Sequence, residues 1–357
     1  MSLGFFQLGR LGGVPVRVHW SVSLVALFFG VILAAQFGLA GGAVVVLAFL
    51  ASILAHEAGH AVVGRHFGMQ PQSMDLMALG GVTRFDREAP TPKADGLTSV
   101  AGPAVNLVIG GVAVGFAVAL RSDILVSIGL VNLAVAVFNM LPGAPLDGGR
   151  VLSAVRWART GSRYRAAREA GNVGRVLGWS MGIAGLGLML NGQPGVFVAI
   201  TGVFIAMNAK AQVRASFIGE QLDGVSVRDL TWFGLAHAGS DMDADSMIDQ
   251  RTRLGGAGAV AIDANDDGVL DGVVLEDQLW ALPIEHRAMV MLHSLMVPFD
   301  QTARAGLDDD LTSVLPRLNP MRPVVTVWDD EKLLGIVPPK LLRERLETAQ
   351  RAALGGT

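Results

Sequence analysis

The chain of 357 residues is 51% hydrophobic and only 17% charged, a more apolar composition than that of an ordinary soluble protein. Its net charge of −3 conceals halves of opposite sign, with +8 over residues 1–217 and −11 over residues 218–357. This pattern predicts a membrane domain over 1–217 and a soluble domain over 218–357. It excludes a nucleic-acid partner, which would require a basic cluster on a folded face. Cysteine is absent, so any metal must be bound by histidine or carboxylate.

The first domain contains six apolar stretches that are long enough, or nearly so, to cross a bilayer, which takes about 20 residues per helix. They predict a multi-pass α-helical membrane protein with six transmembrane helices. The stretches lie near residues 19–37, 41–64, 97–120, 124–141, 174–190 and 195–213.

Basic residues are unevenly divided between the loops that join these stretches. The loops on one side hold nearly all of them, including the arginine-rich run from Arg150 to Arg175, whereas the opposite loops hold only Arg121. Basic loops remain on the cytoplasmic side of a membrane. We therefore predict a protein of the cell membrane with both termini in the cytoplasm.

The second apolar stretch contains the sequence "HEAGH", in which His56, Glu57 and His60 follow an uncharged run. On a helix, His56 and His60 lie one turn apart on the same face, close enough to share a metal ion, and Glu57 can reach a metal-bound water without being a ligand. A chance match is the alternative reading. It would leave three ionisable side chains in an apolar span. On insertion scales, burying each of them there costs on the order of a few kcal/mol. Zinc suits this site, because it binds imidazole nitrogen and keeps one position for water.

The loop after this stretch contains "MALGGVTRF" at residues 77–85, which alternates weakly and includes Gly80 and Gly81. We predict a short strand or hairpin at the membrane edge. An exposed strand of this kind can pair with an extended peptide segment by β-addition, so we take Gly80 and Gly81 as candidate substrate-binding residues.

A third metal ligand must come from elsewhere in the chain, because catalytic zinc usually has three protein ligands. One of the few other acids near the apolar segments is Asp147, in "FNMLPGAPLDGGR" at residues 138–150. The prolines and glycines of this segment interrupt helical hydrogen bonding, and irregular backbone at membrane depth is tolerated where it is buried or lines a wet cavity. Asp147 is therefore a candidate third ligand; a helix N-cap is the alternative.

The second domain contains a strand, turn, strand and helix pattern that occurs twice, with Gly272 and Gly335 in equivalent places. This repeat resembles a tandem pair of CBS domains over roughly 222–350. Paired CBS domains commonly dimerise, so the resemblance implies a homodimer through this region. Nucleotide-binding CBS domains carry Thr or Ser three positions after the glycine and Asp six positions after it. The residues found there argue against bound adenine nucleotide; they are Leu275, Gln278, Pro338 and Leu341. The polar segment 263–268 lacks the twelfth-position glutamate of a calcium loop and is read as a hairpin turn.

The two metal-site motifs together resemble the signatures of the site-2 protease family of intramembrane zinc metalloproteases. "HEAGH" at residues 56–60 and "NMLPGAPLDGG" at residues 139–149 occur in the order and membrane context of that family, and "GPAVN" at residues 102–106 is also similar. The resemblance covers about residues 10–215. With the CBS pair, it points to the prokaryotic subgroup that has C-terminal CBS domains.

The resemblance implies one zinc ion per chain, held by His56, His60 and Asp147, with Glu57 as the general base. Asn139 lies at the end of the fourth apolar stretch, where its amide could donate to the oxyanion or hold the substrate backbone. Asn106 is expected to act similarly. For both asparagines, a hydrogen bond between helices is the alternative.

The predicted function is an intramembrane zinc endopeptidase that performs regulated intramembrane proteolysis. Its expected partners are the lipid bilayer and a membrane-spanning substrate, such as an anti-sigma factor or a pro-factor. The alternative is a membrane transporter or channel gated by CBS domains. A permeation route, however, requires neither a His-Glu-x-x-His helix nor a distant aspartate.

Overall fold

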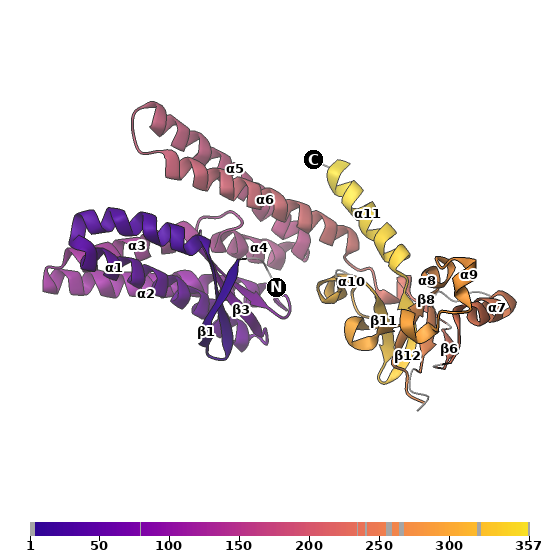
Figure 1. The fold of residues 1–357 in the computed structure, drawn as a ribbon. Coiled ribbons are helices and arrows are strands. Elements are labelled where there is room, and N and C mark those ends of the chain that lie inside the picture. The colour runs from indigo at the N-terminus through magenta and orange to yellow at the C-terminus, as the bar shows by residue number, and fades with distance from the viewer. Residues whose placement is uncertain are drawn as a thin grey trace. The chain divides into compact units, whose positions relative to one another are not determined.

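The computed structural model of the chain describes residues 4–78, 80–233, 235–239, 241–254, 259–263, 268–319 and 323–355. The chain forms two compact units, Met1–Phe217 and Ile218–Thr357 (Figure 1). They divide where the sequence changes from basic and apolar to acidic. Leu79 and most of the polar segment 263–268, both singled out in the sequence, lie outside the described residues.

The first two apolar stretches form one long element, helix α1 (Ser21–His66), which is broken at Gly38. Gly38 has φ 73° and ψ 167°, a non-helical conformation that suits glycine. The two halves of α1 lie against each other, because a Cβ atom built on Gly42 would lie 2.6 Å from the backbone nitrogen of Ala34. The element is therefore a helical hairpin, closely packed at its glycines.

The other helices of the first unit are α2 (Pro92–Leu120), α3 (Asp123–Asn139), α4 (Asp147–Thr160) and α5 (Arg163–Leu190), together with α6 (Val196–Leu222), whose last turn continues past Phe217. Within the described residues, four helices are long and apolar enough to cross a membrane, namely α1, α2, α5 and α6. Helix α3 is apolar but has only 17 residues. The structure therefore agrees with the predicted class, a multi-pass helical membrane protein. Six separate membrane crossings remain a prediction.

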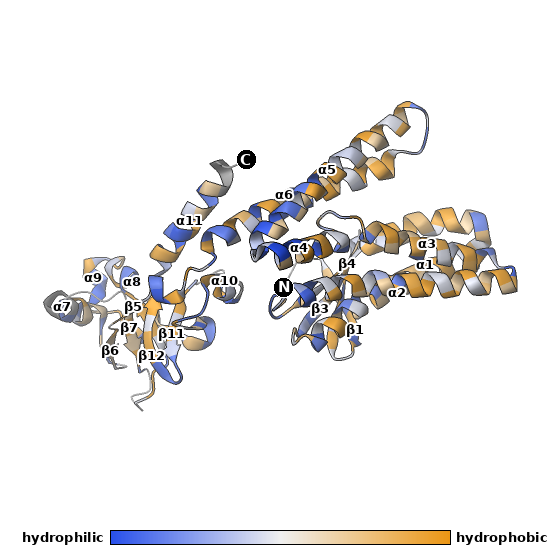
Figure 2. Cartoon of the chain, turned by 180° about the vertical axis from the view of Figure 1, so that it is seen from behind, coloured by the Kyte–Doolittle hydropathy of each residue, from blue (hydrophilic) through white to orange (hydrophobic). Residues whose placement is uncertain are grey.

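Hydrophobic residues predominate along α1, α2 and α3 and along much of α5 and α6 (Figure 2). Large side chains such as Leu27, Val118 and Ile183 are exposed by two thirds or more. A contiguous apolar surface of this kind would be unstable in water and is matched by lipid acyl chains. The first unit is therefore a membrane unit.

A four-stranded sheet packs against the end of α1. Its order is β1 (Phe5–Leu11), β2 (Val14–His19), β3 (Pro71–Met77) and β4 (Gly80–Phe85), with β2 and β3 parallel and the other pairs antiparallel. The small core between the sheet and α1 consists of Val14, Val16, Ala61 and Met74. The sequence predicts the hairpin near 77–85 but not the two N-terminal strands. Strand β4 lies at one edge of the sheet.

A buried ion pair cluster holds three strands of this sheet together. Asp75 is 1% exposed and accepts hydrogen bonds from Arg17 Nε at 2.7 Å and Arg84 Nε at 2.8 Å. Burial alone would raise the pKa of Asp75, but the hydrogen bonds from the arginines and from Ser73 hold that pKa below its usual range. The carboxylate is therefore stabilised in its charged form, and it fixes β2 and β4 on either side of β3.

The second unit contains two four-stranded sheets of the same design. One has the order β6 (Ala236–Ala238), β7 (Ala259–Ile262), β8 (Gly272–Leu275), β9 (Val297–Pro298); the other has β10 (Ala303–Gly306), β11 (Val325–Asp329), β12 (Lys332–Val337), β5 (Trp232–Phe233). In each sheet the first pair is parallel and the others are antiparallel. The helices around them are α7 (Ala244–Leu254), α8 (Glu276–Trp280), α9 (Ile284–Arg287), α10 (Leu311–Val314) and α11 (Pro339–Gly355).

The repeated glycines occupy matching places in these two sheets. A Cβ atom on Gly272 would lie 2.5 Å from the backbone oxygen of Val297 in β9, and one on Gly335 would collide with the backbone oxygen of Trp232 in β5. Each glycine thus permits the close approach of the short outer strand to its neighbour. The repeat seen in the sequence is therefore also a repeat in the structure.

Candidate metal centre

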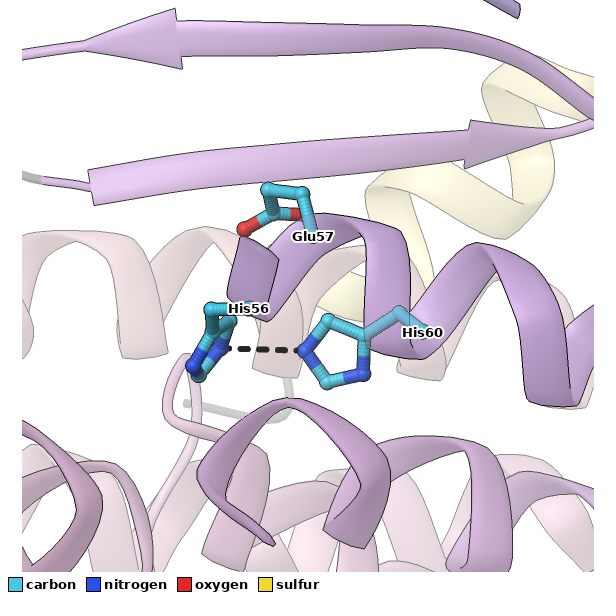
Figure 3. Close-up of side chains that lie close together, drawn as sticks. All are labelled: His56, Glu57 and His60. Atoms are coloured by element: carbon cyan, nitrogen blue, oxygen red, sulfur yellow. Dashed lines mark hydrogen bonds between the residues drawn. The ribbon is translucent and has the colours of Figure 1, made fainter. Parts of the chain in front are cut away.

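The second half of helix α1 carries three ionisable side chains into the interior of the membrane unit. His56 and His60 are each 7% exposed, and Glu57 is 3% exposed. The helix has uninterrupted hydrogen bonding here and places the two imidazoles one turn apart, with their Nε2 atoms separated by 3.1 Å (Figure 3). The possible ligand atoms of the three residues all lie within 4.8 Å of one another.

Asp147 joins this group from the first residue of α4, which follows 91 residues after His56. Its Oδ2 lies 3.1 Å from His56 Nε2, and its Oδ1 lies 3.5 Å from His60 Nε2. The glycines after it allow α4 to begin against the preceding loop, since a Cβ atom on Gly149 would strike the backbone of Ala144. Arg150 fixes the same turn to α2 through a 2.8 Å hydrogen bond to Asp95. The helix start therefore holds the carboxylate in place.

The outer nitrogen of each imidazole meets an oxygen that can only accept a hydrogen bond. His60 Nδ1 lies 2.7 Å from the backbone oxygen of Thr98, and His56 Nδ1 contacts the side-chain oxygen of Asn106. Each Nδ1 must therefore carry the hydrogen, which leaves a lone pair on each Nε2. With neutral imidazoles, two Nε2 lone pairs and the Asp147 carboxylate converge, an arrangement that suits a bound cation.

The glycine opposite the histidines keeps the space between these atoms open. Gly102 of α2 faces both rings; a Cβ atom there would lie 2.5 Å from His56 Nε2 and would also collide with His60 Nε2. The arrangement is two imidazole nitrogens and one carboxylate, with a glycine in place of a side chain beside the two nitrogens. This donor set fits zinc, which binds nitrogen and oxygen ligands in a tetrahedral geometry.

Glu57 lies between α1 and strand β4, and a carboxylate oxygen stays within 4.8 Å of a ligand nitrogen of each histidine (Figure 3). Its Oε2 accepts a 2.7 Å hydrogen bond from the hydroxyl of Thr83. A Cβ atom on Gly81 would lie 2.5 Å from the Glu57 carboxylate, so the strand can approach only because this residue is glycine. The edge strand and the carboxylate are therefore in direct contact. Thr83 is a site residue that sequence reasoning missed, although it lies in the predicted strand.

The remaining predicted site residues have different surroundings. Gly80 and Gly81 are the first two residues of β4, and Asn139 is the last residue of α3 and is partly exposed. Asn106 is 0% exposed and lies behind His56, where its amide nitrogen donates to Asn132 at 2.8 Å. This placement argues against the predicted substrate contact of Asn106, because a substrate cannot reach a fully buried amide whose oxygen already accepts from a histidine.

Several known proteins are similar to this chain. The model of peptidase family M50 matches residues 44–123 and 117–181. A Mycobacterium tuberculosis protein named as a zinc metalloprotease, Rip3, is 34% identical and covers 93% of this chain and 90% of its own length. The site-2 protease from Methanocaldococcus jannaschii is 25% identical over 58% of this chain and 95% of that structure, with a TM-score of 0.47. The CBS domain of a bacterial CNNM/CorC family Mg2+ transporter is 14% identical over 46% of this chain and 92% of that structure, with a TM-score of 0.28.

A buried histidine pair and a carboxylate that meet inside a membrane unit fit the class of membrane metalloproteases. The chain belongs to peptidase family M50, the site-2 protease family, and is a metalloprotease.

Proposed function

We propose that the protein is an intramembrane zinc endopeptidase that hydrolyses a peptide bond of a membrane-anchored protein. The observation that carries this proposal is the convergence of the Nε2 atoms of His56 and His60 on the Asp147 carboxylate, deep in an apolar unit. These three residues would hold one zinc ion. Relatives named as zinc metalloproteases support that choice of metal.

The proposed chemistry divides the work between the metal and Glu57. Bound zinc would polarise the scissile carbonyl and make water more acidic. The Glu57 carboxylate would take the proton from the attacking water and pass it to the leaving amine. Asn139, at the partly exposed end of α3, would donate its amide to the developing oxyanion or to the substrate backbone.

A substrate helix hides its carbonyl groups in its own hydrogen bonds, so it must be extended before water can attack. Strand β4 offers a free sheet edge directly against Glu57, and a β-added substrate strand would place its backbone there. An apolar pocket of about 320 Å³ lies beside the turn that precedes β4 and would accept a large apolar side chain. Its lining includes Phe29, Leu50, Met77 and Val131.

The β-addition step predicts that Val82→Pro lowers cleavage at least tenfold, because proline removes a backbone donor from β4 and disturbs strand pairing. The control is Val82→Thr, which keeps the N–H group and the β-branched shape. Cleavage and substrate capture would both be measured, the latter by co-purification from detergent. Full cleavage and full capture by the proline variant would contradict β-addition.

Metal removal tests the proposed function itself. In proteoliposomes that contain a single-span substrate, a zinc chelator should abolish cleavage, and added zinc should restore it. His56→Ala should lose both zinc and cleavage, since it removes one of three ligands. Cleavage that continues after the zinc has been stripped from the protein would contradict a zinc endopeptidase.

We place the enzyme in the cell membrane of a prokaryote with both termini in the cytoplasm, because basic residues concentrate in one set of loops. The substrates we propose are membrane-anchored regulators of the anti-sigma-factor or pro-factor type. For the second unit we propose a CBS pair that dimerises or docks, supported by its repeated sheets. Light scattering that showed a monomer in detergent at all concentrations would contradict dimerisation.

A further inference from the structure

Two buried asparagines form a directed chain of hydrogen bonds behind His56. Asn106 of α2 is 0% exposed, and Asn132 of α3 is 1% exposed. We propose that Asn132 is a positioning residue for the metal centre, which fixes the tautomer of His56 by setting the orientation of the Asn106 amide. This inference rests on the proposed role of His56 as a zinc ligand.

The direction of the chain follows from its anchor. The amide nitrogen of Asn132 donates to the backbone oxygen of Ile128 at 2.9 Å, and a carbonyl can only accept. The side-chain oxygen of Asn132 therefore faces Asn106 and accepts from its amide nitrogen at 2.8 Å. That leaves the Asn106 oxygen toward His56, where it accepts from Nδ1–H. The lone pair of His56 is thus fixed on Nε2, the atom that faces Asp147.

The tautomer of His60 is fixed more directly than that of His56. His60 donates directly to the backbone oxygen of Thr98, which has no donor to present. Asn106 has both a donor and an acceptor end of nearly the same shape. With its donor end toward His56, the amide would favour a lone pair on Nδ1 and a hydrogen on Nε2, and that nitrogen could not bind a metal. Asn132 supplies the fixed acceptor that excludes this state.

The alternative is that the asparagine pair serves only to join α2 to α3, a common role for polar residues in membrane helices. These helices are already closely packed without it. A Cβ atom on Gly110 would lie 3.0 Å from the backbone oxygen of Gly129, and one on Gly129 would lie 3.0 Å from the backbone nitrogen of Val114. The glycine contact holds the helices together, so the position of the amides next to His56 calls for a different explanation.

The test compares Asn132→Leu with Asn132→Asp. Leucine keeps the approximate shape and removes the acceptor, so the apparent zinc dissociation constant should rise by about 10–100-fold, as for other outer-shell partners. Unlike Asp75, which pairs with two arginines, an aspartic acid buried at position 132 is expected to be neutral, so that its O–H donates to Ile128 while its second oxygen accepts from Asn106. Asn132→Asp should therefore bind zinc within about threefold of the wild type, a prediction from the same pairing rules.

Asn208→Leu is the matched control. Asn208 of α6 makes the same kind of bond, from its amide nitrogen to the backbone oxygen of Phe204 at 2.8 Å, away from the metal centre. Its replacement should leave zinc affinity unchanged. Affinity would be measured by competition with a chelator, and the His56 tautomer by ¹⁵N NMR of the zinc-free, full-length protein in detergent.

The two readouts separate this inference from the proposed function. A wild type that binds no zinc would contradict the proposed function, whereas the tautomer measurement would still test the asparagine chain. Hydrogen on Nδ1 of His56 in the wild type, with a mixed or reversed tautomer in Asn132→Leu, is the expected result. Hydrogen on Nε2 in the wild type, or equal zinc affinity and tautomer in Asn132→Leu, would overturn the inference. If Asn132→Leu does not fold, the wild-type tautomer and Asn132→Asp decide it.

Discussion

Glu57→Gln is expected to abolish proteolysis while leaving zinc bound. Glutamine keeps the shape of the side chain and an oxygen that can accept from Thr83, so the local packing is preserved. The neutral amide cannot take a proton from water. Loss of a general base lowers the rate by about 10²–10⁴-fold. Cleavage of a single-span substrate and zinc content would be measured on the same purified preparations.

Glu88→Gln is the matched control for this substitution. Glu88 belongs to the same unit, but it pairs with Arg163 at the surface, and its side chain is 62% exposed. Its replacement should leave both zinc content and cleavage unchanged. Wild-type cleavage by Glu57→Gln would show that another group acts as the base.

Gly102→Ala is expected to remove the metal and with it the activity. The new methyl group would lie 2.5 Å from His56 Nε2 and 2.6 Å from His56 Cδ2, in the space between the ligands. Because α2 is held by its neighbours, the histidines would have to separate, and the ligand geometry that zinc requires would be lost. The variant should contain far less than one zinc ion per chain and should show no cleavage above background.

Gly111→Ala in the same helix provides the control. A Cβ atom there meets no described atom within 4 Å, and alanine is the better helix former by about 1 kcal/mol. This variant should fold and cleave normally. Gly102→Ala with a full complement of zinc would contradict the placement of the metal beside Gly102.

The metal centre could be predicted from the sequence where its residues are close together in the chain, or where burying them in an apolar segment costs free energy. His56, Glu57 and His60 share one helix, so their spacing alone places them together. Asp147 is distant in sequence, but acids are so rare near the apolar segments that few candidates compete with it. These ionisable side chains are expected in one cluster because burying each of them alone in a membrane segment would cost free energy.

Residues that reach the metal centre only through the packing of distant elements could not be predicted from the sequence. Thr83 reaches Glu57 because β4 lies across α1, and Asn132 reaches Asn106 because α3 lies beside α2. Neither residue differs in the sequence from an ordinary strand threonine or membrane asparagine. Asn106 was predicted to act on the substrate as Asn139 does, whereas its side-chain oxygen is directed at His56.

The positions of the helix ends could likewise be predicted only in part. Hydropathy identifies the lipid-facing part of a helix, and α2 and α5 both begin earlier than their apolar stretches. Thr91 caps α2 by accepting from the backbone nitrogen of Ala94, and Ser162 caps α5 by accepting from that of Arg165. Strands β5 and β9 have two residues each, too few for any alternation to be recognised.

X-ray absorption at the zinc edge of the purified wild-type protein tests the central claim most directly. We expect one zinc ion per chain, bound directly by two imidazole nitrogens and by oxygen donors at about 2.0–2.2 Å. The imidazole signal should fall to one ring in His60→Ala, in whatever zinc that variant retains. A protein purified without zinc, or a zinc shell that lacks imidazole, would contradict the assignment of His56, His60 and Asp147 as the metal ligands.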